Sequence, residues 1–123
     1  MPRPKIRKPA LRSRLRPRVK VWFEADDHYS FGFGLIEILQ TVARAGSIKQ
    51  AAVDLGRSYR HVWGRIKEAE RALGQPLVET RIGGQSAQRS ELTDAARQIV
   101  ADFLRLRGRL IAFMDREFAR RPI

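Results

Sequence analysis

Apolar residues recur along this chain with two periods, and the change of period marks the expected elements. Residues 18–24 alternate between apolar and polar, which predicts a half-buried strand. Its inward positions are Val19, Val21 and Phe23. Residues 25–30 are polar and predict a loop. From Phe33 apolar residues return at three- and four-residue spacing as far as Gly46, which predicts a helix closed by a left-handed glycine.

Two short helices joined by a tight turn are predicted within residues 47–73. Ser47 is suited to cap the first helix, and Gln50 is placed to return a hydrogen bond to the Ser47 backbone N–H, as in a capping box. Gly56 suits a left-handed turn between the helices, and Ser58 is the expected N-cap of the second. This arrangement is a helix-turn-helix.

The second of these helices combines an inward apolar stripe with an outward polar face. The predicted stripe is Val62, Trp63, Ile66, Ala69 or Glu70, and Leu73. The predicted outward residues are Arg60, His61, Gly64, Arg65 and Glu68. We interpret Trp63 as a core anchor rather than a platform for stacking bases, because it lies between Val62 and Ile66. Tyr59 lies at the boundary, and both roles stay open for it.

A wing is predicted directly after the helix-turn-helix. Residues 76–82 predict a strand with proline at its first position, residues 83–90 a loop, and Glu91 with Leu92 a short return strand. Strand, loop and strand at this place are typical of a winged-helix domain. The candidate DNA contacts of the wing are Gln85, Gln88 and Arg89. A plain mobile hairpin tip is the alternative interpretation.

A long final helix is predicted from Asp94 to about Ala119, capped by Thr93. At 1.5 Å per residue it spans about 40 Å, which is more than a domain of this size needs. Its apolar stripe is also broader than packing on one small domain requires, which favours pairing with the same helix of a second copy. The candidate dimerisation residues are Phe103, Leu104, Leu110, Ile111, Met114 and Phe118.

Positive charge is concentrated at the N-terminus. The net charge is +12, and residues 1–20 hold nine of the 25 Lys and Arg residues but none of the 13 acidic ones. Residues 1–17 also hold four of the six prolines, which predicts a disordered arm. We expect the arm to bind DNA phosphates, with salt-sensitive affinity. Its candidate residues are Arg3, Lys5, Arg7 and Lys8. A solvated tail and a membrane-surface segment are the alternatives, and the prolines disfavour the second.

Composition limits the remaining classes. The 123-residue chain has no Cys, which excludes disulfides and thiolate metal sites and suits a reducing cytoplasmic setting, near the nucleoid for a DNA-binding protein. No run is apolar enough to predict a transmembrane helix or a secretory signal. Asp26, Asp27 and His28 are expected to form a solvated turn rather than a metal site. We expect no enzyme, cofactor or metal, because nothing assembles a catalytic site.

The predicted fold class is therefore mainly α with a small β-sheet. It is a winged helix-turn-helix with a long C-terminal dimerisation helix over residues 93–119. We expect one domain over residues 18–123, preceded by the arm.

Sequence-selective binding of double-stranded DNA by a dimeric transcriptional regulator is the predicted function. First-turn residues of the second helix would reach base edges, and Arg60 or Arg65 would make a bidentate bond to guanine. These first-turn residues are Ser58, Tyr59, Arg60 and His61. Ser47, Lys49 and Gln50 would hold phosphates. The alternatives are a largely non-specific architectural protein of the nucleoid, and a protein-interaction module on a winged-helix scaffold.

Residues 45–84 also carry a resemblance to a known family. They resemble the N-terminal DNA-binding domain of ModE-type, molybdate-responsive regulators and, more distantly, the winged helix-turn-helix of LysR-type regulators. The matching residues are Gly46-Ser47-Ile48, Ala51-Ala52, Gly56, Ser58-Tyr59-Arg60, Trp63, Pro76-Leu77-Val78-Glu79 and Gly83-Gly84. The resemblance implies a homodimer with paired long helices and recognition helices in successive major grooves.

Three departures from that family qualify the resemblance. ModE-type repressors carry C-terminal molybdate-binding modules, whereas this chain stops at Ile123, so we expect no direct molybdate sensing and no small-molecule ligand. Their wing is glycine-rich, whereas residues 85–90 read QSAQRS. A glycine that is usual near the start of the long helix corresponds to Ala96.

Overall fold

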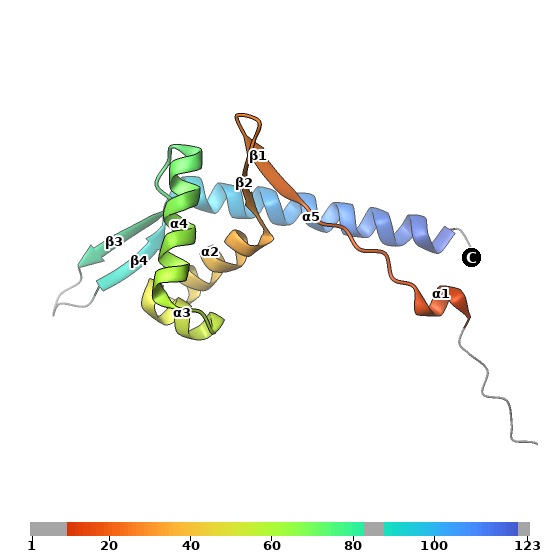
Figure 1. Cartoon of the computed structure of the whole chain (residues 1–123), viewed down its shortest axis with the longest axis horizontal. Coiled ribbons are helices and arrows are strands. Elements are labelled where there is room, and N and C mark those ends of the chain that lie inside the picture. Colours follow the sequence, from red (N-terminus) through yellow and green to blue (C-terminus); the bar gives the residue numbers. More distant parts are fainter. Residues whose placement is uncertain (1–9, 83–87, 121–123) are drawn as a thin grey trace, which may run out of the picture.

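The computed structural model describes residues 10–82 and 88–120. The elements are α1 (Leu11–Arg14), β1 (Trp22–Ala25), β2 (His28–Gly32), α2 (Phe33–Ala45), α3 (Ile48–Leu55), α4 (Tyr59–Leu73), β3 (Val78–Ile82), β4 (Gln88–Leu92) and α5 (Asp94–Arg120). The helix-turn-helix and the β3–β4 wing lie at one end, and α5 projects away from them (Figure 1). The predicted fold class, a mainly helical winged helix-turn-helix with a long last helix, is confirmed.

Two apolar clusters hold the elements together. Helices α2, α3 and α4 share the first, in which Ala51 and Ala52 are buried and let the helices cross closely. The second joins α2, α5 and both hairpins around the fully buried Phe103. Its ring lies 5.5 Å from that of Phe23 and 6.1 Å from that of Phe31, measured between centroids. Such tilted aromatic contacts add to the burial energy.

The helix ends follow the local sequence signals. Ser47 Oγ accepts from the Gln50 backbone N–H at 3.0 Å, and Ser58 Oγ accepts from that of His61 at 3.0 Å. Gly56 has a φ of 65°, the left-handed value that the turn between α3 and α4 requires. One half of the predicted capping box is wrong, because the Gln50 side chain donates to Asp54 at 2.9 Å instead. The Asp54 carboxylate, one turn ahead in the helix, is a charged acceptor and binds the Gln50 amide in place of the predicted cap contact.

The first hairpin differs from its prediction. The strand expected over residues 18–24 is β1, which begins only at Trp22. Within the expected loop over residues 25–30, Ala25 belongs to β1 and residues 28–30 belong to β2. Ala25 pairs with His28, so only Asp26 and Asp27 form the turn, with φ values of 53° and 65°. Two consecutive left-handed residues match the right-handed twist of the strands. Val19 is exposed rather than inward.

The wing and the long helix have the predicted order. Strand β3 begins at Val78, two residues later than expected, and β4 is longer than predicted, with Ile82 opposite Gln88. Thr93 caps α5 by accepting from the Ala96 backbone N–H at 3.2 Å. No atom lies within 4 Å of a β-carbon built on Gly108, so it marks no close contact among the described residues.

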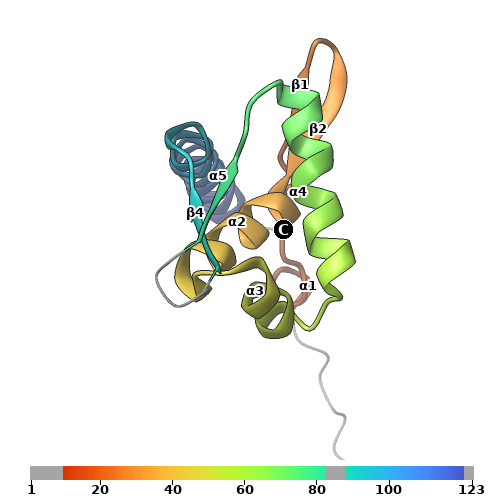
Figure 2. The ribbon, with the colours of Figure 1, turned by 90° about the vertical axis from the view of Figure 1, so that its left-hand side faces the viewer.

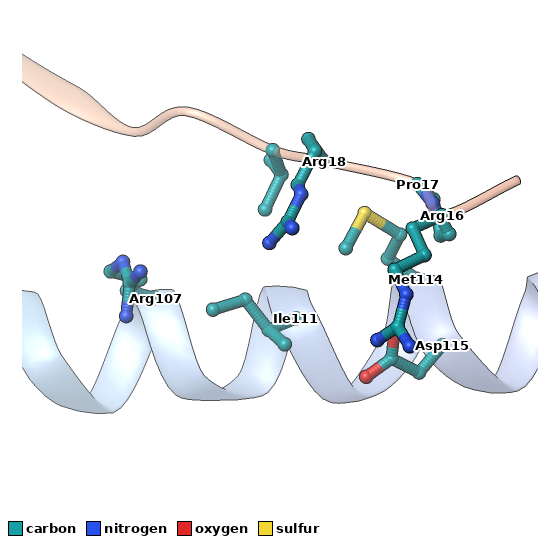
Figure 3. A pocket seen from close by; sticks show the side chains of 8 residues that line it. Arg16, Pro17, Arg18, Arg107, Ile111, Met114 and Asp115 are labelled. Carbon is teal, nitrogen blue, oxygen red and sulfur yellow. The ribbon is translucent and has the colours of Figure 1, made fainter.

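The second half of the predicted arm runs along α5 (Figure 1). Residues 11–14 form the short helix α1, which the sequence analysis did not predict. The Arg12 guanidinium lies 5.3 Å from the Phe118 ring centroid and donates to the Phe118 carbonyl at 3.3 Å. Arg16 to Val19 then line a pocket with α5 residues that include Ile111 and Met114 (Figure 3). The division of the chain at residue 17 stays a prediction.

Candidate nucleic-acid interface

The first turn of α4 is held by its cap and is open to solvent. Ser58 uses its hydroxyl for the cap, and Tyr59, Arg60 and His61 follow it with exposed side chains. The cap bond stabilises a helix start that would otherwise carry unsatisfied N–H groups. Helix α4 is thus presented on a frame of α2 and α3, with the wing on the other flank of α2 (Figure 2).

The outward face of α4 is basic along one line. Val62, Ile66 and Ala69 are buried, so the positions opposite them lie farthest from the core. These outward positions are Arg60, Gly64 and Arg71, and Lys67 and Glu68 flank them on the two sides. Within the described residues no hydrogen bond or ion pair holds the Arg60 guanidinium, so it is available to an external acceptor.

Arg65 and His61 lie on a flank of α4 rather than on its outermost line. Both line a groove with Glu37 of α2 and with Arg57 of the α3–α4 turn. Arg65 also lies 3.7 Å from the Glu68 carboxylate, one turn ahead. Of the two arginines considered for guanine, Arg60 therefore has the more open position. Arg57, a further cation here, was missed by the sequence analysis because turn residues carry no periodic signal.

Trp63 is not the core anchor that the sequence predicted. Its side chain is 43% exposed, and the Lys67 ammonium lies 5.7 Å from its ring centroid. Successive residues of a helix are about 100° apart, so Trp63 cannot share the inward direction of its neighbour Val62. Ala69 rather than Glu70 completes the inward stripe. Trp63 thus belongs to the surface that α4 presents.

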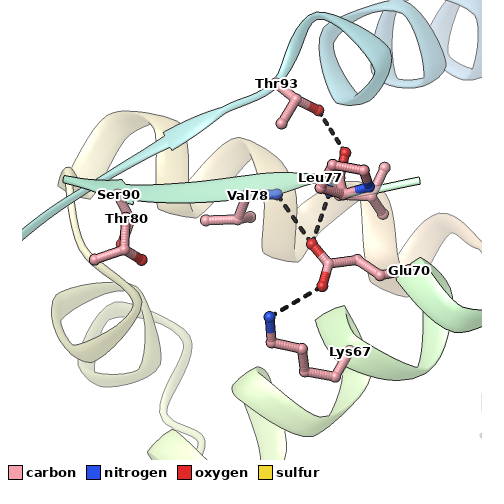
Figure 4. A network of polar contacts seen from close by, with 8 residues as sticks. Lys67, Glu70, Leu77, Val78, Thr80, Ser90 and Thr93 are labelled. Atoms are coloured by element: carbon pink, nitrogen blue, oxygen red, sulfur yellow. Dashed lines mark hydrogen bonds and ion pairs between the residues drawn. The ribbon is translucent and has the colours of Figure 1, made fainter.

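Glu70 joins α4 to the wing (Figure 4). Its carboxylate accepts from the backbone N–H of Leu77 at 2.7 Å and of Val78 at 3.3 Å, and lies 3.1 Å from the Lys67 ammonium. Burial by itself raises the pKa of Glu70, but the hydrogen bonds from Leu77, Lys67 and Val78 and the charge of Lys67 outweigh it, so the pKa is lowered. This ionised group fixes the entry to β3 relative to α4.

The wing is also fixed to the start of α3. The Ser90 backbone N–H donates to the Gly46 carbonyl at 2.8 Å, directly before the Ser47 cap. Arg89 is exposed on β4 and lies opposite Arg81 of β3. Arg81 is a second exposed cation of the wing, and it is not among the residues predicted from the sequence. Gln88 pairs with Ile82 through the strand, and its side chain is outside the described part. Gln85 lies outside the described residues.

The residues predicted to hold phosphates come from two regions. Lys49 and Gln50 are exposed at the start of α3, while Ser47 is partly buried with its hydroxyl committed to the cap. The arm residues predicted to bind DNA lie outside the described residues: Arg3, Lys5, Arg7 and Lys8. The structure therefore brings the α3, α4 and wing candidates to one end of the molecule, and leaves the arm contact a prediction.

The predicted dimerisation residues do not form one free face. Phe103 has no exposed surface and lies in the core, so its predicted role in dimerisation is not supported. Leu104 packs beside that core. Segment 11–19 of the same chain contacts Phe118 and shares a pocket with Ile111 and Met114. The exposed large apolar residues of α5 are instead Leu106, Leu110 and Phe113, of which only Leu110 was predicted.

Other kinds of site find little support. Within residues 10–82 and 88–120 no three His, Cys, Asp or Glu side chains gather as metal ligands would. Nor does any helix of that part have the length and apolarity to cross a membrane.

Comparisons with known proteins agree with this geometry. The family model described as "Bacterial regulatory helix-turn-helix protein, lysR family" matches residues 33–97, which is more than half of the chain and spans α2 to the start of α5. The family is one of regulatory proteins, which agrees with the expectation that the chain is not an enzyme.

Individual relatives cover the same region. The chain is 35% identical over 75 residues to the molybdenum-pterin-binding protein MopA of Rhodobacter capsulatus, which is 61% of this chain and 28% of that protein. It is 32% identical over 80 residues to the molybdenum transport protein ModE of Herbaspirillum seropedicae, which is 65% of this chain and 30% of that protein. The chain thus spans less than a third of these relatives.

Solved structures share the fold. The complex of the DNA-binding domain of CbnR with DNA aligns at 26% identity and a TM-score of 0.55, over 72% of this chain and 97% of that chain. Full-length LysG from Corynebacterium glutamicum, with bound effector Arg, aligns at 22% identity and a TM-score of 0.57, over 76% of this chain and 31% of that chain. The second likeness concerns the fold alone.

Proposed function

Because the chain belongs to the lysR family of bacterial regulatory helix-turn-helix proteins, we propose that it regulates transcription by binding double-stranded DNA sequence-selectively. One observation carries the proposal: a capped helix α4 with an exposed first turn and a basic outward line that includes Arg60 and Arg71. A solved relative, the DNA-binding domain of CbnR, is itself a complex with DNA. The expected setting is the cytoplasm, at the nucleoid.

Arg60 is the proposed reader of guanine. Its side chain is exposed on the first turn of α4, where helix residues of such motifs meet base edges. A guanidinium bidentate to guanine O6 and N7 discriminates by ~1–3 kcal/mol against other bases. Lys49, Arg57, Arg81 and Arg89 are proposed to contact phosphates, which positions the protein without selecting sequence.

Selection from a random duplex pool at fixed salt tests the proposal. The wild type should enrich a motif, whereas an architectural protein would enrich none. Arg60→Ala should bind the selected duplex about 10-fold or more weakly, with a smaller loss on a mixed-sequence duplex. Arg116→Ala removes the same charge from the exposed distal part of α5 and should leave both affinities nearly unchanged. Equal losses on both duplexes for Arg60→Ala would refute base reading.

A second copy is proposed to pack on α5. Leu106, Leu110 and Phe113 follow the helical spacing of one face and are exposed. Leu106 and Leu110 also line a groove with Phe23 of β1, and burying such an apolar stripe favours association. Two recognition helices would then meet half-sites about one helical turn, ~34 Å, apart.

The oligomeric state tests this part separately. Light scattering should give a dimer for the wild type and a monomer for Leu110→Asp. Ala112→Asp places the same charge on the exposed opposite side of α5 and should remain dimeric. A wild type that is monomeric at micromolar concentration would exclude the dimer while leaving DNA binding open.

Molybdate is not assigned to this chain. The names of the relatives connect them with molybdenum, but the chain spans less than a third of each of them. Protein interaction on a winged-helix scaffold remains the other candidate, and the failure of the wild type to bind any duplex at low salt would favour it.

A further inference from the structure

Gly64 occupies a position in α4 that nothing within residues 10–82 and 88–120 explains. It is the sixth residue of a 15-residue helix, where glycine is less favourable than any residue except proline. A β-carbon built on Gly64 has no heavy atom within 4 Å, and its φ is not in the left-handed region. Neither packing nor backbone conformation therefore requires a glycine here.

The position of Gly64 on the outward face of α4 indicates which kind of partner would use the space left by its missing side chain. It lies opposite the buried Val62, Ile66 and Ala69, on the line that stands farthest from the core. Arg60 lies one turn before it and Arg71 two turns after it on the same line, so the missing side chain leaves a notch between two cations. A polyanion is the chemistry that such a pair attracts.

The dimensions of the DNA major groove explain how such a notch would affect binding. A helix with its side chains is about 10–12 Å wide, and the major groove of B-DNA is about 12 Å wide and about 8.5 Å deep. The outermost line of a helix that enters this groove meets the base edges first. A residue without a side chain on that line lets the helix axis approach the bases more closely.

We propose that Gly64 is a specificity-determining position, at which α4 seats against the base edges of the major groove and thereby brings Arg60 within reach of a guanine. This inference rests on the proposed function and deepens it. A β-carbon at residue 64 would hold the helix away from the bases, and the short hydrogen bonds of Arg60 would be lost before the longer-range attraction to phosphates is. The notch therefore contributes to selectivity more than to general affinity.

Gly64→Ala tests the proposal, with Gly108→Ala as a matched control. Gly108 is also a helical glycine with no atom within 4 Å of its built β-carbon, and it is exposed on α5, far from the DNA-facing elements. Both substitutions should raise the melting temperature by about 2–5 °C, because alanine is the better helix former. Circular dichroism verifies that both variants fold.

Binding is then measured on two duplexes, one selected by the wild type from a random pool and one of mixed sequence. Gly64→Ala should bind the selected duplex about 10-fold or more weakly, with a change below about threefold on the mixed sequence. Gly64→Ser, which has a similar bulk but lower helix propensity, should lose affinity equally without the thermal gain. Gly108→Ala should bind both duplexes as the wild type does.

Three results would overturn the inference. Unchanged affinity of Gly64→Ala for the selected duplex would show that no partner needs the notch. Equal losses on both duplexes would place the sugar–phosphate backbone there instead of base edges. An equal loss for Gly108→Ala would attribute the effect to helix substitution in general. A wild type that selects no duplex refutes the proposed function itself, which is a different result.

Discussion

Replacement of Glu70 should reveal how strongly the wing is fixed to the recognition helix. Its side chain is 12% exposed, and its carboxylate accepts one short bond, 2.7 Å from Leu77 N, and one longer bond, 3.3 Å from Val78 N. Glu70→Ala removes both bonds and leaves two partly buried amide donors without that acceptor. The contact with Lys67 is lost as well.

The magnitude follows from the kind of bond that is lost. A hydrogen bond to a charged group contributes about 1.5–3 kcal/mol, and the longer bond contributes less. The half-exposed Lys67 adds less than about 1 kcal/mol. Glu70→Ala should therefore lower the free energy of unfolding by about 2–4 kcal/mol. Glu70→Gln keeps a neutral acceptor and should cost about half as much.

Urea denaturation at pH 7 measures these losses. Glu68→Ala is the control, because Glu68 lies two residues earlier in the same helix and makes only an exposed pair with Arg65 at 3.7 Å. It should cost about 0–1 kcal/mol. A loss below 0.5 kcal/mol for Glu70→Ala, estimated against these bond energies, would refute the structural role assigned to Glu70.

The same residue predicts a pH dependence. The pKa of Glu70 in the folded state lies below its ordinary value of 4.5. The ionised carboxylate therefore stabilises the fold fully above about pH 4.5, and this contribution is lost as the pH falls through the folded-state pKa. The difference in stability between wild type and Glu70→Gln should stay constant from pH 7 to 5 and narrow below about pH 4.5. A constant difference down to pH 3.5 would contradict this.

Two further substitutions test Trp63 on α4 and the contact of Arg12 with the far end of α5. Trp63→Ala should cost less than about 2 kcal/mol in urea denaturation, because the side chain is 43% exposed, whereas a buried aromatic residue costs about 3–5 kcal/mol. A loss of unfolding free energy in the higher range would indicate that Trp63 is a buried core residue. Arg12→Ala removes the contact with Phe118 and should speed amide hydrogen exchange in residues 11–19 while leaving α4 unchanged. Arg14→Ala is its control, and equal exchange in both variants would contradict an anchoring role for Arg12.

The sequence allowed the helical frame to be predicted because its signals are local. A serine hydroxyl reaches the N–H three residues ahead, and a glycine accepts a positive φ, so Ser47, Ser58, Gly46 and Gly56 each marked a boundary correctly. The 27 residues of α5 were predictable for the same reason, since they repeat one apolar stripe. The caps and the apolar repeat of these elements depend on residues close in sequence, so they could be predicted without knowledge of tertiary contacts.

The wrong predictions concern residues for which several local arrangements are possible and the folded structure selects one. The Gln50 amide could bond its own cap or Asp54, and only the folded geometry decides. Strand β2 was missed because an Asp-Asp turn is a weaker hairpin signal than Asn-Gly, although aspartate tolerates left-handed φ. Trp63 was misassigned because its hydrophobicity was given more weight than its angular position beside Val62.

The contacts that hold the candidate interface together are mostly invisible in sequence, because they use backbone atoms. Ser90 N–H bonds the Gly46 carbonyl, Glu70 accepts from Leu77 N–H, and the Thr93 hydroxyl donates to the Pro76 carbonyl at 2.8 Å. These three bonds join the wing to the starts of α3 and α5 and to the recognition helix. The Glu70 and Thr93 side chains can be recognised from sequence, but their distant backbone partners cannot, and the bond between Ser90 and Gly46 joins two backbone groups. Loss of one of these bonds should therefore shift the wing and α4 relative to each other, and should weaken the proposed DNA binding without changing a residue that is proposed to contact DNA.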